Sequence, residues 1–539
     1  MPPDDLLILN AHCVTMNPGL PVTDAVLIRD GRIAALGPAA KATPAAQTVD
    51  AGGRLVLPGF QDAHIHLLNG GTRLIDTAPL YDATTLNELQ SALAAHAARW
   101  PGPMVWGAGW QSGFFGDANL TCDIIDAVVP DRPCLIHDAS FHNACLNSTA
   151  LTMAAITDTT PDPLNGHIVR DAAGRATGML HEAAIDWATS ALPRPSDETL
   201  SLGLRAGQAH ANRHGITGII DPSIQSHHAR IYGAAAAAGA LSLRVNGACL
   251  VRADDTVETA LARLTDLRHA HGTADFHLNA AKVFMDGGLE NRTAALLEPY
   301  ADARGGNAAL MFTQDQTAAL FTALDAARFQ IHVHCIGDAA TRAALDGFAT
   351  ARRTNGTWPA LHQIAHVELV HPADLPRFAS LGVMANMQPL WAANDPIIPE
   401  PTFAMIGPAR LNHTYPFRSL IDAGAPFCLG SDWAVTSLNP FHIIGTAVTR
   451  EPPRHRGRAD PFHPEQRLTV AEAVQGYTTG AAAACWRGSF TGQLAPGFSG
   501  DLIVLDRDIF TCDPYAIAEA QVLLTLFKGR QVHRHPGCP

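Results

Sequence analysis

Short apolar runs alternate with alanine-rich stretches through the middle of this chain, and that alternation predicts parallel β/α units. Most of these apolar runs end on a polar residue or glycine, or lead directly into one. The eight runs are the one that leads to His64, then residues 218–221, 243–246, 278–284, 331–334, 363–366, 383–386 and 427–430. Eight such units predict a (β/α)8 TIM barrel of the α/β class, whose reactive side chains lie at the carboxyl ends of the strands.

Both ends of the chain predict β structure without helices between the strands. Residues 6–9, 25–29 and 33–36 are typical of short strands, and Asp30-Gly31 is a hairpin-turn signal between the last two. Residues 502–505 and 522–527 repeat the pattern near the other end. We therefore expect residues 1–57 and 491–539 to form one small composite β-sandwich domain, and residues 58–490 to form the barrel.

The stretch 72–195 is too long for one crossover and carries its own strand and turn signals, which predicts an insertion after the first barrel strand. Insertions over a barrel mouth shape access to the site. Its aromatic and polar residues are therefore substrate-contact candidates, although packing is the commoner role for each. The candidates are Trp106, Trp110, Phe114, Phe115, His142 and Glu182, together with Trp433 in the barrel.

Composition narrows the function classes. With 47% hydrophobic and 16% charged residues among 539, the chain is a folded soluble protein. The net charge of -13 and the lack of a basic run argue against nucleic acid and favour a small-molecule substrate. The acidic start and the short apolar stretch after it predict no signal peptide or membrane span, hence a cytoplasmic location. Homo-oligomerisation stays open, and the ten cysteines lack Cys-x-x-Cys spacing.

His64 and His66 form a His-x-His pair at the end of the first barrel strand. Because side chains two apart on a strand share a face, the pair aims two imidazoles at one point, as a metal site requires. Two hydrogen-bonded neighbours are the alternative. His334, His366 and Asp432 end other strands and so converge on the same region. His332 shares the face of His334, either as a fallback ligand or as an interior histidine paired inside the barrel.

Lys282 lies inside an apolar strand, where a buried ammonium is costly unless it is compensated. An ion pair with Asp286 or Glu290 would compensate it. Carbamylation by carbon dioxide is the second solution, because it replaces the cation with a carboxylate that can bridge two metal ions. The residues alone favour the ion pair.

The order and placement of these ligands resemble those of the amidohydrolase superfamily. Residues 282–288, 292–296, 334–338 and 387–389 further resemble the branch of N-substituted formamide deformylases and YtcJ-like proteins, and the resemblance covers essentially the whole chain. It implies a carbamylated Lys282 that bridges two metal ions. Imidazole nitrogens with carboxylate oxygens suit zinc, and other divalent metals are the alternative. We expect one ion on His64, His66 and Asp432 and the other on His334 and His366.

Three positions depart from the pattern of that branch: Gly288, Cys335 and Ala434 stand where serine, alanine and proline are frequent. No ligand is lost, but the preferred substrate is left open. Cys335, beside a ligand, leads us to expect sensitivity to thiol reagents.

We expect a metal-dependent hydrolase in which an activated hydroxide cleaves a non-peptide C–N bond. Asp432 would pass the proton to the leaving nitrogen, and Gln388 or His142 would donate to the carbonyl oxygen. A heterocycle deaminase is one alternative, which Lys282 argues against, and an esterase or lactonase is another. A catalytically silent binding barrel would have lost at least one ligand, and none is missing.

Overall fold

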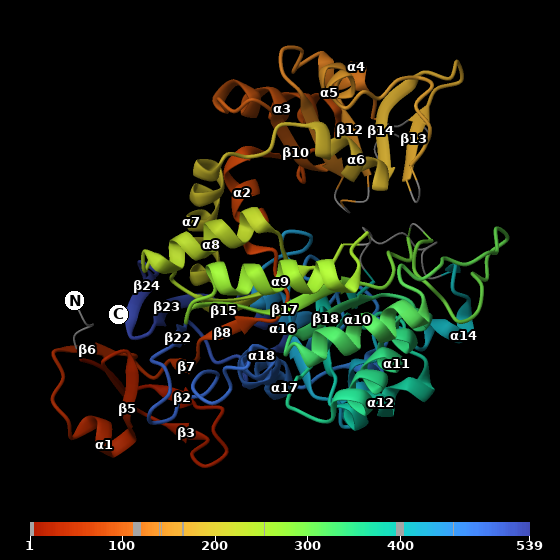
Figure 1. The fold of residues 1–539 in the computed structure, drawn as a ribbon. Coiled ribbons are helices and arrows are strands. Elements are labelled where there is room, and N and C mark those ends of the chain that lie inside the picture. The colour runs from red at the N-terminus through yellow and green to blue at the C-terminus, as the bar shows by residue number, and fades with distance from the viewer. Residues whose placement is uncertain are drawn as a thin grey trace. The chain divides into compact units, whose positions relative to one another are not determined.

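The computed structural model describes residues 5–110, 120–138, 141, 143–163, 166–252, 254–290, 292–394, 404–455 and 457–538. The chain divides into two compact units. Unit 1 comprises Met1–Leu67 and Gln208–Pro539, and unit 2 comprises Leu68–Gly207. Figure 1 shows the strands and helices of each unit. The predicted insertion, 72–195, falls within unit 2.

Unit 1 contains the predicted barrel, an eight-stranded parallel sheet in the order β21-β20-β19-β18-β17-β16-β15-β8. Its strands are β8 (Phe60–Asp62), β15 (Ile216–Ile224), β16 (Arg244–Leu250), β17 (Phe276–Phe284), β18 (Gln330–Cys335), β19 (Gln363–His366), β20 (Met384–Met387) and β21 (Phe427–Leu429). The two outermost strands of this order meet where the N–H of Ala63 donates to the carbonyl of Leu429 at 3.0 Å. The predicted (β/α)8 barrel is confirmed.

Helices follow most of these strands, and their starts are encoded locally. Thr313 caps α10 in a reciprocal capping box with Gln316, and the Thr256 side chain caps α9. The longer helices of unit 1 are α8 (Ser226–Ala237), α9 (Val257–His271), α10 (Gln314–Ala326), α11 (Asp338–Asn355) and α16 (Pro440–Thr449). Shorter ones are α12 (Leu375–Leu381), α15 (Phe417–Asp422), α17 (Val470–Gln475) and α18 (Ala481–Ala484). None of the helices in the described ranges is long and apolar enough to cross a bilayer.

Strands near the two ends of the chain form two further β-sheets, and the second of them combines both ends. One sheet has the order β5-β4-β1-β6 and the other β24-β23-β22-β7-β2-β3, so β22 from the C-terminal end pairs antiparallel with β7 from the N-terminal end. The strands are β1 (Leu6–Leu9), β2 (His12–Val14), β3 (Val22–Thr23), β4 (Val26–Arg29), β5 (Arg32–Leu36), β6 (Gln47–Asp50), β7 (Leu55–Pro58), β22 (Leu502–Leu505), β23 (Val522–Phe527) and β24 (Arg530–Arg534). One apolar core, with Ile8 and Val504 among its members, joins the two ends.

A buried ion pair connects the start of β16 to this β domain. Arg244 donates to the carboxylate of Asp501 and to Ser499 Oγ, the latter at 2.7 Å. The second oxygen of Asp501 accepts the backbone N–H of Lys528 at 2.7 Å. The Arg244 guanidinium lies 4.8 Å from the centre of the Phe527 ring. Every charge in this cluster therefore has a hydrogen-bond partner, as burial requires.

Unit 2 is built on a mixed six-stranded sheet in the order β13-β14-β12-β11-β10-β9. Its strands are β9 (Thr77–Pro79), β10 (Val105–Trp110), β11 (Cys134–Asp138), β12 (Asn143–Leu146), β13 (Gly166–Arg170) and β14 (Ala176–Glu182). Its helices include α2 (Leu67–Asp76), α3 (Leu86–Arg99), α6 (Ala183–Ala191) and the first part of α7 (Asp197–Arg213). Helices α2 and α7 touch at Gly71 and Gly203, where a side chain on either glycine would collide with the other helix.

Candidate metal centre

His64 and His66 lie just beyond β8, which ends at Asp62. We expected them at the end of the strand, where alternation of side chains would align them. Because they lie in the loop instead, their common direction comes from loop contacts. The backbone N–H groups of His64 and Ser431 both donate to Asp62 Oδ1, at 3.1 and 3.0 Å. The N–H of Asp432 donates back to the carbonyl of His64 at 2.7 Å. These bonds join the loops that follow the first and last barrel strands.

The joined loops bring three predicted ligands together. Nε2 of His64 lies 3.6 Å and Nε2 of His66 lies 3.3 Å from Oδ1 of Asp432. One ligand atom from each of the three residues falls within 4.8 Å of the others. Asp432 adopts a left-handed φ of 58°, a conformation that costs energy for a residue other than glycine. Holding this carboxylate between the two imidazoles therefore has a conformational cost, which the rest of the fold offsets.

His334 and His366 come from neighbouring strands, β18 and β19. Their ring centres are 4.6 Å apart, and the His366 ring centre is 5.0 Å from that of His64. Nδ1 of His334 is buried without a hydrogen-bond partner among the described residues, and Asp286 Oδ1 is 3.4 Å away. The four predicted imidazole ligands and Asp432 thus form one continuous cluster.

Cys335 is fully buried one residue after His334 on β18. Because strand side chains alternate faces, it points away from the face that carries His334. Burial also raises the pKa of its thiol well above the usual range. Both features argue against the expected sensitivity to thiol reagents, since an accessible thiolate is the form that reacts readily.

Gln388 supports the backbone of His366. Its Oε1 accepts the N–H of His366 at 2.8 Å, and its Nε2 donates to Oδ1 of Asn386 at 2.7 Å. His366 has a positive φ of 78°, so this bond holds a strained residue. The Gln388 side chain is 1% exposed. These contacts favour a positioning role over the predicted donation to a substrate carbonyl.

Lys282 lies on the inner face of β17 and is 1% exposed. Its Nζ makes no hydrogen bond or ion pair with any residue in the described ranges, and it lies 4.6 Å from the centre of the Phe284 ring. The predicted ion pair with Asp286 or Glu290 is wrong. Asp286 is instead occupied by the backbone N–H groups of Ala295, Ile336 and Gly337, at 2.8–3.0 Å.

Burial dominates the electrostatics of the cluster. It lowers the pKa of the Lys282 amine to about 8, against a smaller opposing effect of Asp432. Burial, reinforced by the Lys282 charge, lowers the pKa of His64 well below its usual range, and the same two effects act on His332. For His366 burial is again the largest cause. These imidazoles are therefore neutral and keep lone pairs for coordination.

The donor set fits a divalent cation. Neutral imidazole nitrogens beside a carboxylate are ligands typical of zinc and related metals. The unpartnered Nδ1 of His334 and the uncompensated Lys282 would both be unfavourable if nothing else bound in the cluster. His332 is held differently, because its Nε2 lies 3.0 Å from Nδ1 of His64 inside the barrel.

The residues predicted to contact the substrate lie in different parts of the structure. Trp433 follows Asp432 and is buried, with its ring centre 5.4 Å from that of His210. Trp110 is 1% exposed in the core of unit 2, which favours a packing role. Glu182 is half-buried at the end of β14. His142, Phe114 and Phe115 lie outside the described residues.

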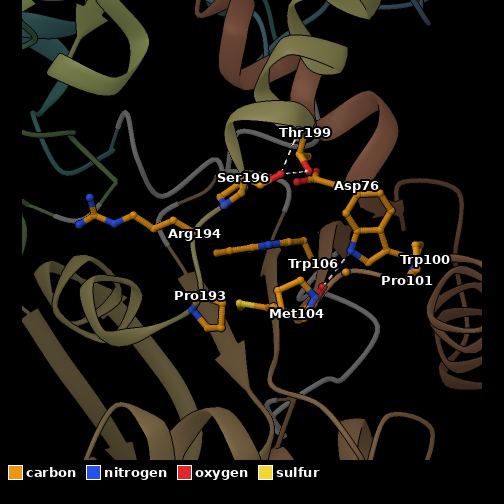
Figure 2. Close-up of a pocket in the computed structure, with 12 residues that line it drawn as sticks. Asp76, Trp100, Pro101, Met104, Trp106, Pro193, Arg194, Ser196 and Thr199 are labelled. Atoms are coloured by element: carbon orange, nitrogen blue, oxygen red, sulfur yellow. Dashed lines mark hydrogen bonds between the residues drawn. The ribbon is translucent and has the colours of Figure 1, made fainter. Parts of the chain in front are cut away.

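Unit 2 has a pocket of its own, with a volume of about 240 Å³ (Figure 2). The indoles of Trp100 and Trp106 and the buried carboxylate of Asp76 line it. Trp100 Nε1 donates to the carbonyl of Met104 at 3.0 Å, which fixes that ring. Only Trp106 of this lining was among the sequence candidates. The pocket is smaller than the usual small-molecule site.

Asn386 on β20 and Gln388, the residue that follows this strand, were not assigned from the sequence a role in supporting the predicted ligands. Asn386 and Gln388 alternate within an apolar run, which places both side chains inside the barrel. Asn386 Nδ2 donates to the carbonyl of Ala63 and to Oε1 of Gln363, both at 2.8 Å. Buried amides at alternating positions were the available signal for a network beneath the ligands.

Comparisons with known proteins agree with this architecture. The chain is 29% identical to the N-substituted formamide deformylase of Arthrobacter pascens, over 97% of either chain. It is 28% identical to the putative amidohydrolase YtcJ of Bacillus subtilis (strain 168), over 95% of this chain and 96% of the relative. The crystal structure of an uncharacterized metal-dependent hydrolase from Pyrococcus horikoshii OT3 shares the fold, with a TM-score of 0.78 and 24% identity, over 95% of this chain and 99% of that one.

The model of the Amidohydrolase family matches residues 47–533, which include the whole barrel and all six predicted ligands. The predicted kinship with N-substituted formamide deformylase and YtcJ is confirmed as well. The chain therefore belongs to the amidohydrolase family, hydrolases that act on carbon–nitrogen bonds other than peptide bonds.

Proposed function

We propose that this protein hydrolyses the amide-type C–N bond of a small N-substituted amide or formamide at the cluster around Asp432. The observation that carries the proposal is the convergence of Asp432 with His64 and His66 at 3.3–3.6 Å, from opposite ends of the barrel sequence. The name of the Arthrobacter relative supports the substrate class.

We assign zinc to the site, as two ions. His64, His66 and Asp432 would hold one ion and His334 and His366 the other, with Lys282 as the shared ligand after carbamylation. When bound, the metal would polarise the substrate carbonyl and lower the pKa of water toward about 7.

Lys282 suits carbamylation because its amine is buried, unpaired and easily deprotonated. Its pKa of about 8 leaves a fraction of neutral amine at neutral pH. The neutral nitrogen attacks carbon dioxide, one proton is released, and a carboxylate replaces the cation. That exchange removes the uncompensated positive charge and supplies an anionic oxygen ligand to the cluster.

Asp432 moves the proton. Its Oδ1 lies between two imidazole nitrogens, where the carboxylate can accept the proton of the attacking water. The C–N bond then breaks as that proton passes to the leaving nitrogen, which departs as a neutral amine. The left-handed backbone at Asp432 fixes the direction of this carboxylate.

The first experiment is metal analysis of protein purified without chelator, followed by a hydrolysis screen. We expect one to two equivalents of zinc per chain, and turnover of N-substituted amides or formamides. Cyclic amides, aryl esters and amino-heterocycles complete the panel. A fully active protein without metal would refute the proposal, and release of ammonia from the heterocycles alone would identify a deaminase.

The Asp432→Asn variant tests the proton path. It should lower kcat by about 10³-fold or more, with a circular dichroism spectrum like that of the wild type. Asp325→Asn is the matched control, because Asp325 is also buried but bonds His362 and Trp358. The control should lower stability and leave kcat almost unchanged. Near-normal turnover of Asp432→Asn would remove Asp432 from the mechanism.

A further inference from the structure

His332 lies inside the barrel with no exposed surface, two residues before His334. Its position on β18 pairs with Lys282 on β17 and with Gln363 on β19. All three side chains therefore point to the interior of the barrel, because paired positions in a sheet share a face. The proposed function gives His334 a ligand role and leaves His332 without one.

The two nitrogens of His64 face different partners. Nε2 lies 3.6 Å from Oδ1 of Asp432, and Nδ1 lies 3.0 Å from Nε2 of His332. A neutral imidazole carries one proton, on one nitrogen or the other. His64 can bind a cation through Nε2 only if its proton is on Nδ1, so that Nε2 keeps a free lone pair.

The direction of the hydrogen bond with His332 determines whether the His64 proton is on Nδ1 or on Nε2. If Nδ1 of His64 carries the proton, it donates to Nε2 of His332. The opposite arrangement, with His332 Nε2 as the donor, leaves the proton of His64 on Nε2, where it blocks a cation. Only the first arrangement is compatible with coordination, and it requires His332 to carry its own proton on Nδ1.

Nothing else in the described part of the chain fixes the proton of His332. Its Nδ1 is buried and has no hydrogen-bond partner there. By contrast, His362, another buried barrel histidine, has both nitrogens occupied: Nδ1 accepts the N–H of Ile331 at 3.0 Å, and Nε2 lies 3.0 Å from Asp325 Oδ1. An unpartnered nitrogen is unfavourable for folding, which favours a role at the other end of the His332 ring.

We propose that His332 is a positioning residue that accepts the Nδ1 proton of His64 and thereby turns the Nε2 lone pair of His64 toward the metal. The proposal rests on the proposed function, because it presumes a cation at His64. It adds a residue outside the coordinating set whose chemistry, not only its volume, determines metal affinity.

His332→Gln and His332→Leu separate the two roles. The glutamine oxygen reaches about as far along the side chain as Nε2 and can accept the same proton, whereas leucine fills the space without an acceptor. We expect His332→Leu to weaken zinc binding by about 10- to 100-fold in competition with a chelating dye, and His332→Gln to restore most of the affinity. The Co²⁺-substituted protein should show altered visible bands for leucine and near wild-type bands for glutamine.

His362→Gln is the matched control, since it removes a buried barrel histidine away from the cluster. It should lower the melting temperature of the metal-free protein without changing zinc affinity. Unchanged zinc affinity in a folded His332→Leu protein would overturn the proposal. Equal loss in His332→Gln and His332→Leu would also overturn it, and would indicate direct ligation by His332. Failure of the wild type to bind zinc or cobalt would instead refute the proposed function.

Discussion

Arg244 and Lys282 are two buried cations on neighbouring barrel strands, and they differ in whether polar partners compensate the charge. Leu250, the last residue of β16, pairs with Lys282, and Arg244 is the first residue of that strand. The two therefore lie toward opposite ends of the barrel. Arg244 bonds Asp501 and Ser499, whereas Lys282 has no polar partner among the described residues. Arg244 is thus compensated by its surroundings, whereas the lack of a polar partner for Lys282 fits its proposed place among the metal ligands.

The largest effect is expected from Lys282→Ala. Loss of the proposed bridging carboxylate should lower kcat/KM by on the order of 10³-fold, measured with the best substrate of the screen. Short-chain carboxylic acids such as propionate should restore part of the activity, because they supply a carboxylate to the space left by the lysine. Full activity without added acid would show that Lys282 is as purely structural as Arg244.

Arg244→Met should act on stability and not on turnover. It leaves Asp501 buried without its main cation, so we expect a loss of about 3–5 kcal/mol in the free energy of unfolding. Denaturant titration measures this loss, and kcat/KM per folded molecule should stay within about twofold of the wild type. A variant of normal stability would contradict the view that this end of the barrel depends on a satisfied ion pair.

Lys282 should also give metal-free protein a pH-dependent stability. Its pKa is about 8 in the fold and 10.5 in the unfolded chain, so between these values the unfolded state binds more protons. Stability should therefore rise as pH increases from about 8 to 10.5, by on the order of 1–3 kcal/mol. Lys282→Met keeps the volume but should lack this rise. Parallel pH profiles of the two proteins would show that burial does not perturb Lys282.

The smallest effect is expected from Arg244→Lys. Lysine keeps the charge but loses the paired geometry that reaches Asp501 and Ser499 together, so we expect a cost of about 1–2 kcal/mol. A difference in melting temperature measures it. A cost equal to that of Arg244→Met would mean that the two-pronged geometry, and not the charge, satisfies Asp501.

The barrel could be predicted because the buried strands of a parallel sheet appear in the sequence as short local runs of apolar residues. Each strand is an apolar run, and the reactive residues at its carboxyl end are polar, as in 331–334 and 363–366. Lys282 was recognised because a charge within such a run is unusual. Its partner was predicted wrongly, since only the folded loops show that Asp286 is already occupied by three backbone N–H groups.

Contacts between residues that are far apart in the sequence could not be predicted in this way. His332 and His64 are 268 positions apart, and no pattern along the chain indicates that their rings meet. The left-handed backbone at His366 and Asp432 was equally hidden, because neither residue type demands it. Strain at a site is imposed by surrounding hydrogen bonds, such as that from His366 to Gln388, and these exist only after folding.

The glycine contact between α2 and α7 has a consequence for how this enzyme can diversify. The chain enters unit 2 at Leu68 and leaves it at Gly207, along two helices that touch at Gly71 and Gly203. The two helices at which the chain enters and leaves unit 2 therefore lie side by side, and unit 2 can be regarded as an exchangeable module, or cassette. Transplanting a different cassette onto the same catalytic barrel needs only two junctions about one helix diameter apart, with no barrel strand cut.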